Sequence, residues 1–201
     1  MTAPDFRHAI EDYLRANALP VEKFSHQPRL YRLARKLAEG LAFDDDVLHA
    51  AAWLHDLGVF TGHRPEDPEA LARWDNVAYV LDRAPELLRQ FGFPEAKIPA
   101  VIEAIRNHQP SATPSTVEGA LLRDADILEQ LGAVGILRTV CKIGRDTRFS
   151  TFKDALRSLE RALRELPSRL HFPAARAEAE ARVRALGAFL QSAAAEGGEW
   201  L

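Results

Sequence analysis

The sequence is poor in sulfur, with one cysteine, Cys141, and one methionine in 201 residues. A single thiol excludes an internal disulfide and any zinc site built from several cysteines. It also favours a reducing, cytoplasmic location. The first fifteen residues include acids and no apolar run, so we expect no secretory signal peptide.

Long hydrophobic runs and an excess of positive charge are also missing. No apolar stretch approaches the roughly 20 residues of a membrane-spanning helix, so we expect no membrane association. The formal net charge is −3, unlike the basic footprint of a dedicated nucleic-acid-binding protein. Apolar residues make up 47% of the chain, which is sufficient for one hydrophobic core.

Alternating polar and apolar residues, the pattern of strands, are lacking as well, whereas the helical period recurs in every long segment. We therefore predict an all-α bundle in a single domain over residues 1–201, with a core at about 20–150 and a C-terminal helical extension over 151–196. Within it we expect one helix over 69–83 and a second, short helix that starts at Pro85. Thr151 and Asp154 have the spacing of a capping box.

The most informative stretch runs from Ala50 to Gly58, where apolar residues lead to the adjacent pair His55-Asp56. The pattern predicts a buried helix whose last turn carries two side chains that can bind metal. Gly58 is placed to form a left-handed cap. Asp56 lies where the helix dipole disfavours negative charge, and a nearby cation would remove that cost. From this stretch alone, a pair that merely forms hydrogen bonds is equally consistent.

Other polar residues point toward the core from separate helices. His26 begins an amphipathic helix, and His108 lies on an apolar helical face. Asp124 and Asp126 occupy a helix that is apolar on nearly all sides, and burying a carboxylate is costly unless it is paired or bound to metal. The two point to opposite faces, so periodicity does not choose between them. A set of imidazoles and carboxylates suits Mn, Mg, Co, Ni, Fe or Zn.

This pattern resembles the HD-domain superfamily of metal-dependent phosphohydrolases. The residues that carry the resemblance are His26 in 26–29, the pair His55-Asp56 in 52–58, and Asp126 in 123–128. The resemblance spans about residues 20–150. Glu118-Gly119, the Asp124-Ala125-Asp126 triplet and the segment 132–138 are similar to a bacterial YpgQ/YedJ-like branch, whose members are described as nucleotide pyrophosphohydrolases or uncharacterised phosphohydrolases.

The resemblance implies an HD-type helical fold and a divalent metal site formed by His26, His55, Asp56 and Asp126. It implies hydrolysis of a nucleotide, or of another small phosphate ester or anhydride, through a metal-activated water. In this hypothesis Asp56 is both ligand and proton acceptor. His108 would act as a base or as the acid for the leaving group, although a packed structural histidine is an equal alternative.

Phosphate oxygens also need cations to balance their charge. Arg29, one turn after His26, is the first candidate. A second group is Lys142, Arg145 and Arg148, which continue a basic helical face that begins at Arg138. An ordinary solvated face is the alternative interpretation of this second group.

The chain departs at a few positions from the pattern of the proteins it resembles. Ile127 and Glu129 replace a basic residue and an Asp of the branch, and Val59 stands where nucleotidase members often carry Glu. The substrate class is therefore less firmly indicated than metal binding. His63 and His108 are the only histidines between the pair and Asp126, which favours one metal ion over two.

Other functional classes stay open at this point. A di-iron oxygenase of related fold needs more ligands than the sequence offers, and a non-catalytic HD-type signalling domain is expected to lack part of the ligand set. A purely structural bundle would bind no metal, and a (p)ppGpp hydrolase would carry longer motifs. The expected partner is a small phosphorylated substrate, and a homodimer is left open.

Overall fold

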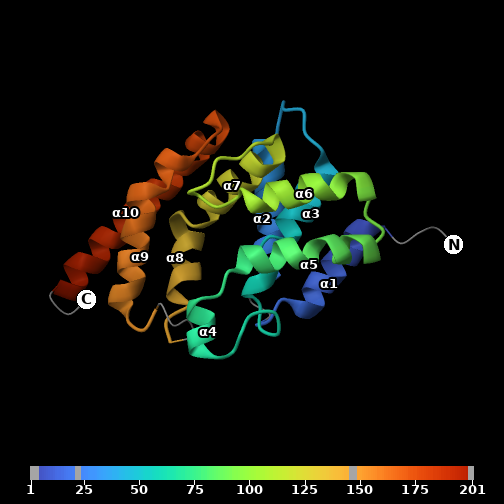
Figure 1. Cartoon of the computed structure of the whole chain (residues 1–201). Helices are drawn as coiled ribbons and strands as arrows, with labels where there is room; N and C mark the ends of the chain where they lie inside the picture. The colour runs from blue at the N-terminus through green and yellow to red at the C-terminus, as the bar shows by residue number, and fades with distance from the viewer. Residues whose placement is uncertain (1–4, 21–23, 145–148, 199–201) are drawn as a thin grey trace. The chain divides into compact units, whose positions relative to one another are not determined.

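The computed structural model describes residues 5–20, 24–144 and 149–198. These residues form ten α-helices and no strand, apart from an isolated bridge between Thr61 and Arg64 (Figure 1). The chain divides into two compact units, residues 1–123 and 124–201, and the boundary falls within helix α7 (Val117–Glu129). The prediction of an all-α fold is confirmed, and the assignment of a single domain stays a prediction.

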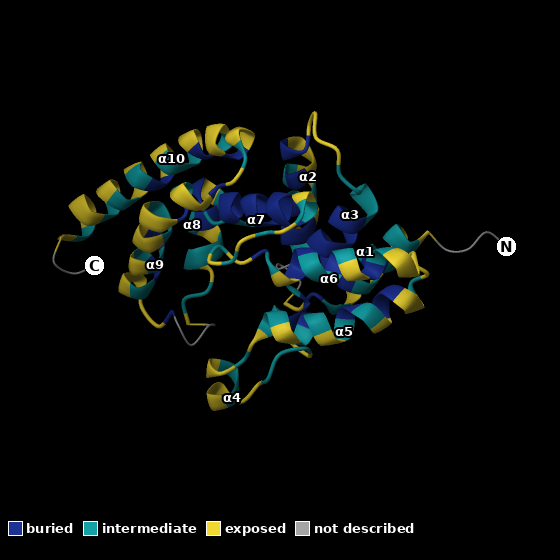
Figure 2. Cartoon of the chain, turned by 45° about the horizontal axis from the view of Figure 1, so that its top comes forward, coloured by how far each residue is buried: buried dark blue, intermediate teal, exposed yellow. Residues whose placement is uncertain are grey.

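The first unit is built around α3 (Asp45–Leu54), which contacts three other helices of the unit. Every residue from Val47 to Leu54 is buried, as the dark blue of α3 in Figure 2 shows. Three successive alanines at 50–52 let neighbouring helices approach closely. The other elements of this unit are α1 (Phe6–Asn17), α2 (His26–Leu37), η2 (Leu57–Val59), α4 (Pro68–Ala72), α5 (Asn76–Gln90), η3 (Glu95–Lys97) and α6 (Ile98–Arg106).

The turn after α3 differs from the expected left-handed cap. Gly58 is not among the glycines with positive φ, so the cap prediction was wrong. The position is instead crowded, because a Cβ on Gly58 would lie 2.8 Å from the carbonyl oxygen of Asn76. The indole N–H of Trp74 donates to the carbonyl oxygen of Gly58 at 2.8 Å. The start of α5 therefore fixes the turn that follows His55 and Asp56.

Two helix boundaries were also predicted incorrectly. The helix expected over 69–83 is interrupted, because the Asp75 side chain accepts from the N–H groups of Val77 and Ala78 and caps a new helix, α5. The short helix expected from Pro85 does not exist separately, since α5 continues through Pro85 to Gln90.

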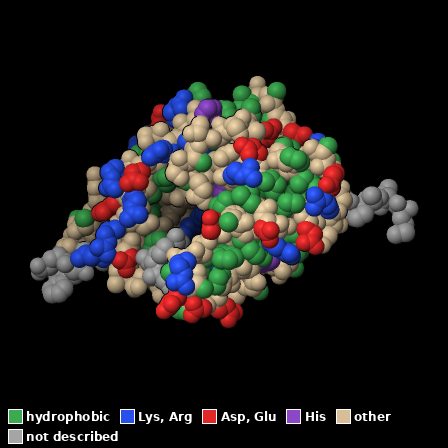
Figure 3. Space-filling model, viewed as in Figure 1, with side chains coloured by type: hydrophobic (Ala, Val, Ile, Leu, Met, Phe, Trp, Pro, Cys, Tyr) green, Lys and Arg blue, Asp and Glu red, His purple; other side chains and the backbone are tan. Residues whose placement is uncertain are grey.

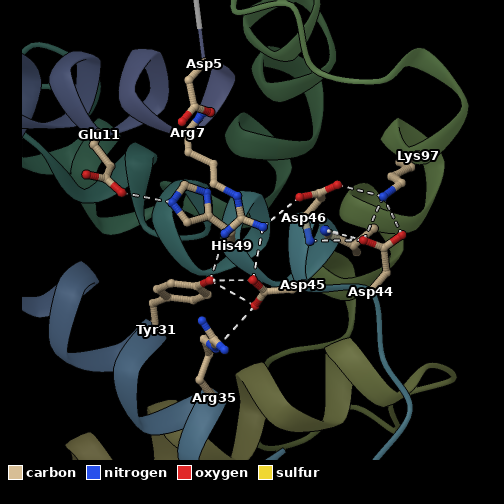
Figure 4. Close-up of polar contacts among 11 residues, drawn as sticks. Asp5, Arg7, Glu11, Tyr31, Arg35, Asp44, Asp45, Asp46, His49 and Lys97 are labelled. Carbon is tan, nitrogen blue, oxygen red and sulfur yellow. Dashed lines mark hydrogen bonds and ion pairs between the residues drawn. The ribbon is translucent and has the colours of Figure 1, made fainter.

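A polar network joins α1, α2 and the start of α3 (Figure 4). Arg7 donates to the Tyr31 hydroxyl at 2.9 Å and to Oδ1 of Asp46 at 2.6 Å. Tyr31 in turn donates to Asp45 at 2.9 Å. Lys97 donates to Asp46 at 2.8 Å and holds the pKa of that carboxyl below its usual range. The acids at the start of α3 therefore have structural partners in addition to the helix dipole.

His49 extends this network into the core and gives the fold a pH dependence. Its Nε2 lies 3.1 Å from Glu11, and Tyr31 packs on its ring. Burial lowers the pKa of His49 below 6.5, and Arg7 adds to this, while Glu11 and Asp45 oppose it. As the pH falls, His49 therefore binds a proton at a higher pH in the unfolded chain than in the folded protein. This contribution to stability is complete above pH 6.5 and is lost as the pH falls through the folded pKa.

We therefore expect the free energy of unfolding of the wild type to fall below pH 6.5 more steeply than that of His49→Gln. Urea titrations of both proteins from pH 8 to pH 5, with a chelator present, measure the difference. Equal slopes for the two proteins would show that His49 does not contribute to the pH dependence.

The second unit contains α8 (Gly132–Val140), α9 (Phe152–Glu165), η4 (Pro167–Arg169) and α10 (Pro173–Gly197). The capping box of Thr151 and Asp154 at the start of α9 is confirmed. Lys and Arg side chains over α9 and α10 alternate with acidic ones (Figure 3), so this face carries mixed charge. Within the described ranges of the chain, every helix is too short or too polar to cross a bilayer.

Candidate metal centre

Three of the predicted ligands come together in the first unit. His26 is the first residue of α2, His55 follows the last residue of α3, and Asp56 precedes η2. One ligand atom from each lies within 4.8 Å of the others. Oδ2 of Asp56 is 3.7 Å from Nε2 of His26 and 3.6 Å from Nε2 of His55. Residues from separate helices thus converge on a shared point.

The tautomer of His55 is set by its backbone. Nδ1 lies 2.9 Å from the carbonyl oxygen of Ala52, which can only accept a hydrogen bond, so Nδ1 carries the hydrogen. Nε2 then holds a lone pair. Within the described residues this buried atom has no hydrogen-bond partner. An orphaned acceptor of this kind costs about 1–3 kcal/mol, which a bound cation would offset.

His108 lies next to this group, just beyond the end of α6. Its ring centroid is 5.2 Å from that of His55, and the side chain is buried. Nδ1 donates to the carbonyl oxygen of Ile105 at 2.6 Å, so the lone pair of His108 is also on Nε2. The prediction that His108 lies on an inward apolar face is consistent with this position.

The geometry and chemistry of the cluster fit a divalent cation. Two ligands about 2.1 Å from one ion lie roughly 3.0–3.5 Å apart, close to the separations between Asp56 and the two histidines. Backbone carbonyls that fix the Nδ1–H of a ligating histidine are a common outer partner in metal sites. The Asp56 side chain is 22% exposed, so a substrate or water can reach it.

Asp126 belongs to the second unit, where its surroundings are well defined. Gln130 donates to Oδ2 of Asp126 at 3.0 Å, and Arg138 forms an ion pair with Oδ1 at 3.9 Å. Asp124 instead accepts from the backbone N–H groups of His171 and Phe172 at 2.8–3.0 Å. Asp124 therefore ties α7 to the start of α10, and the assignment of Asp126 as the fourth ligand stays a prediction.

The predicted phosphate-binding cations are placed differently from one another. Arg29 is half-buried and donates to the hydroxyl of Ser25 at 2.8 Å. The ammonium of Lys142 lies 5.4 Å from the centre of the Phe149 ring. Arg145 and Arg148 lie outside the described residues. Their roles in binding substrate stay predictions.

Comparison with known families defines the class of this protein. Residues 24–131 match the HD domain family, which is more than half of the chain. The match includes His26, the His55-Asp56 pair and Asp126. The chain therefore belongs to the HD-domain family, as its motifs indicated. None of the curated proteins compared with it by sequence matches.

Solved structures extend the similarity over nearly the whole chain. The crystal structure of Bacillus subtilis YpgQ is 23% identical, covers 100% of both chains and superposes with a TM-score of 0.73. YpgQ in complex with ADP is 24% identical over 99% of this chain and 98% of that chain, with a TM-score of 0.71. A predicted HD-superfamily hydrolase from an uncultured Thermotogales bacterium is 26% identical over 96% and 91%, with a TM-score of 0.62. The fold is that of HD-superfamily hydrolases.

Sequence reasoning did not predict the contacts that three residues make with the predicted site residues or with the adjoining turn. Trp74 holds the turn after Asp56, and Gln130 and Arg138 contact Asp126. The spacing of Asp126 and Gln130, four residues apart on a helix, could have indicated the second contact. Nothing local in the sequence connects Trp74 with Gly58.

Proposed function

We propose that this protein is a metal-dependent phosphohydrolase that acts on a nucleotide or on another small phosphate ester or anhydride. The observation that carries the proposal is the convergence of His26, His55 and Asp56, with the lone pair of His55 buried and directed into the group. Membership of the HD-domain family supports the same conclusion. The ADP complex of YpgQ makes nucleotides the first substrates to test.

These three residues would hold the cation, and the family motif adds Asp126 as a fourth ligand. When bound, a divalent cation lowers the pKa of water and withdraws electron density from a phosphoryl oxygen. The identity of the ion is open among Mn, Mg, Co, Ni, Fe and Zn, because the mixed nitrogen and oxygen donors suit them all.

The protein side chains would manage protons and charge during hydrolysis. Water attacks phosphorus as the bond to the leaving oxygen breaks, and Asp56 accepts the proton from the attacking water. That same proton then passes from Asp56 to the leaving oxygen, and His108 would carry it, because its lone pair on Nε2 can accept the proton and release it again. Arg29 and Lys142 would balance the charge of the phosphate oxygens.

A reconstitution screen tests the proposal. Protein stripped with a chelator is loaded with each of the six metals and offered nucleoside mono-, di- and triphosphates and bis(p-nitrophenyl) phosphate. We expect metal-dependent hydrolysis of at least one compound and its loss on chelation. Metal binding without hydrolysis would favour a signalling domain, and oxygen uptake by the iron form without hydrolysis would favour an oxygenase. Failure to bind any metal would favour a structural bundle.

A further inference from the structure

Arg138 lies beside Asp126 and has no role in the reaction as described above. Its Nη1 atom, on a side chain of α8, is 3.9 Å from Oδ1 of Asp126 and 3.7 Å from Oε2 of Glu129. Both separations exceed the usual hydrogen-bond distance of about 2.7–3.2 Å. The two acids therefore attract the guanidinium without taking up its directional donors.

Two glycines bring Arg138 to this position. Gly132 starts α8 with a φ of +70°, a conformation that glycine adopts without strain. At Gly135 a Cβ would overlap the carbonyl group of Gln130, so only glycine lets α8 lie this close to the end of α7. Arg138 follows Gly135 by about one helical turn and shares its face. The close approach of the two helices thus places the guanidinium next to Asp126.

Most of the hydrogen-bonding capacity of Arg138 is still available. Within the described residues all its polar contacts use Nη1, including a 3.4 Å hydrogen bond to the carbonyl oxygen of Glu129. A guanidinium carries five N–H donors in a planar fork. Nε and Nη2 therefore keep their donors, and the side chain is 27% exposed. A held guanidinium with two open donor atoms matches the geometry of phosphate oxygens.

The other basic candidates are engaged differently. Lys142, in the turn that follows α8, directs its ammonium to the Phe149 ring, and Arg29 donates to Ser25. An ammonium is also a point charge, whereas the guanidinium fork can bind two phosphate oxygens at once. Arg138 is therefore better suited than Arg29 or Lys142 to bind a phosphate group that coordinates the same metal ion as Asp126.

We propose that Arg138 is a substrate-binding residue that grips a phosphoryl group of the substrate through Nε and Nη2. The inference rests on the proposed function, because it takes Asp126 as a metal ligand. Glu129 restrains one edge of the guanidinium, and the opposite edge faces the phosphate. Arg138 would thus contribute to the affinity for substrate, whereas the affinity for the metal ion alone would not depend on Arg138.

The test compares Arg138→Met with Arg184→Met, a matched control. Arg184 also lies 3.9 Å from a carboxylate of its own helix, that of Glu180, but is 73% exposed. In the manganese form we expect Arg138→Met to weaken the binding of inorganic phosphate and to raise KM by about 10- to 100-fold. Calorimetric Mn²⁺ affinity without phosphate should stay close to that of the wild type. Arg138→Lys should recover part of the phosphate affinity, and Arg184→Met should behave as the wild type.

In Arg138→Met the buried Glu129 loses the counter-charge that Arg138 supplies, which can destabilise the fold. The double variant Glu129→Gln/Arg138→Met also removes the negative charge of Glu129, so phosphate binding can still be measured if the single variant misfolds. A fall in Mn²⁺ affinity, with phosphate binding unchanged at saturating metal, would assign Arg138 to positioning Asp126 and overturn the inference. Wild-type phosphate affinity in Arg138→Met and in the double variant would overturn it as well. If the wild type itself binds no metal and hydrolyses no phosphate compound, the proposed function fails instead.

Discussion

Replacing His55 by glutamine is expected to lower the affinity for Mn²⁺ by more than about 100-fold, since even outer partners of metal ligands contribute 10- to 100-fold. The reason is the direction of its lone pair. The bond from Nδ1 to Ala52 fixes the ring so that Nε2 faces Asp56 at 3.6 Å. Glutamine has no ring and no nitrogen lone pair at this position, so the site loses a ligand that the backbone has already oriented.

The measurement is calorimetric titration of the chelated protein with Mn²⁺, together with hydrolysis of whichever compound the screen identifies. His49→Gln is a close control, because His49 is a second buried histidine, within α3, but contacts Glu11 and Tyr31. It should bind Mn²⁺ as the wild type does. If His55→Gln retained wild-type metal affinity, the assignment of the cluster as a metal centre would be wrong. Circular dichroism confirms that both variants are folded.

The sequence predicts the central helix well because its signal is local. The segment from Val47 to Leu54 is apolar except for His49, which requires burial on all sides, and the structure buries every residue of it. The pairing of His55 with Asp56 follows from their adjacency, and the inward direction of His26 follows from its spacing to the next apolar residues. The convergence of three of the four predicted ligands could therefore be expected before any coordinates.

Other features depend on contacts between distant parts of the chain, which a local pattern cannot reveal. Gly58 was expected to supply a positive φ, but the reason for glycine there is the nearby carbonyl of Asn76. The interruption between α4 and α5 comes from the capping side chain of Asp75, which outweighs the continuous helical period of the segment. The position of Arg138 depends on how closely Gly135 allows α8 to approach Gln130.

Asp124 and Asp126 could not be told apart by periodicity, and they are expected to give opposite phenotypes. Asp124 is fully buried and accepts three N–H···O contacts from His171 and Phe172. In Asp124→Asn an amide N–H₂ replaces one carboxylate oxygen and opposes these donors. We expect a loss of about 3 kcal/mol in the free energy of unfolding, because charged hydrogen bonds are broken and buried donors lose their partner. Metal affinity of the folded fraction should change little.

Asp126→Asn should behave in the reverse manner. Its carboxylate is 15% exposed, and its ion pair with Arg138 is long, at 3.9 Å. The change in stability should stay below about 1 kcal/mol, as for other partly exposed pairs. Mn²⁺ affinity and hydrolysis should be lost together, because a neutral amide is a much weaker ligand for a divalent cation than a carboxylate. Urea denaturation and calorimetric titration of both variants distinguish the two roles. Retention of metal affinity in Asp126→Asn would remove Asp126 from the ligand set and leave the three residues of the first unit as the centre.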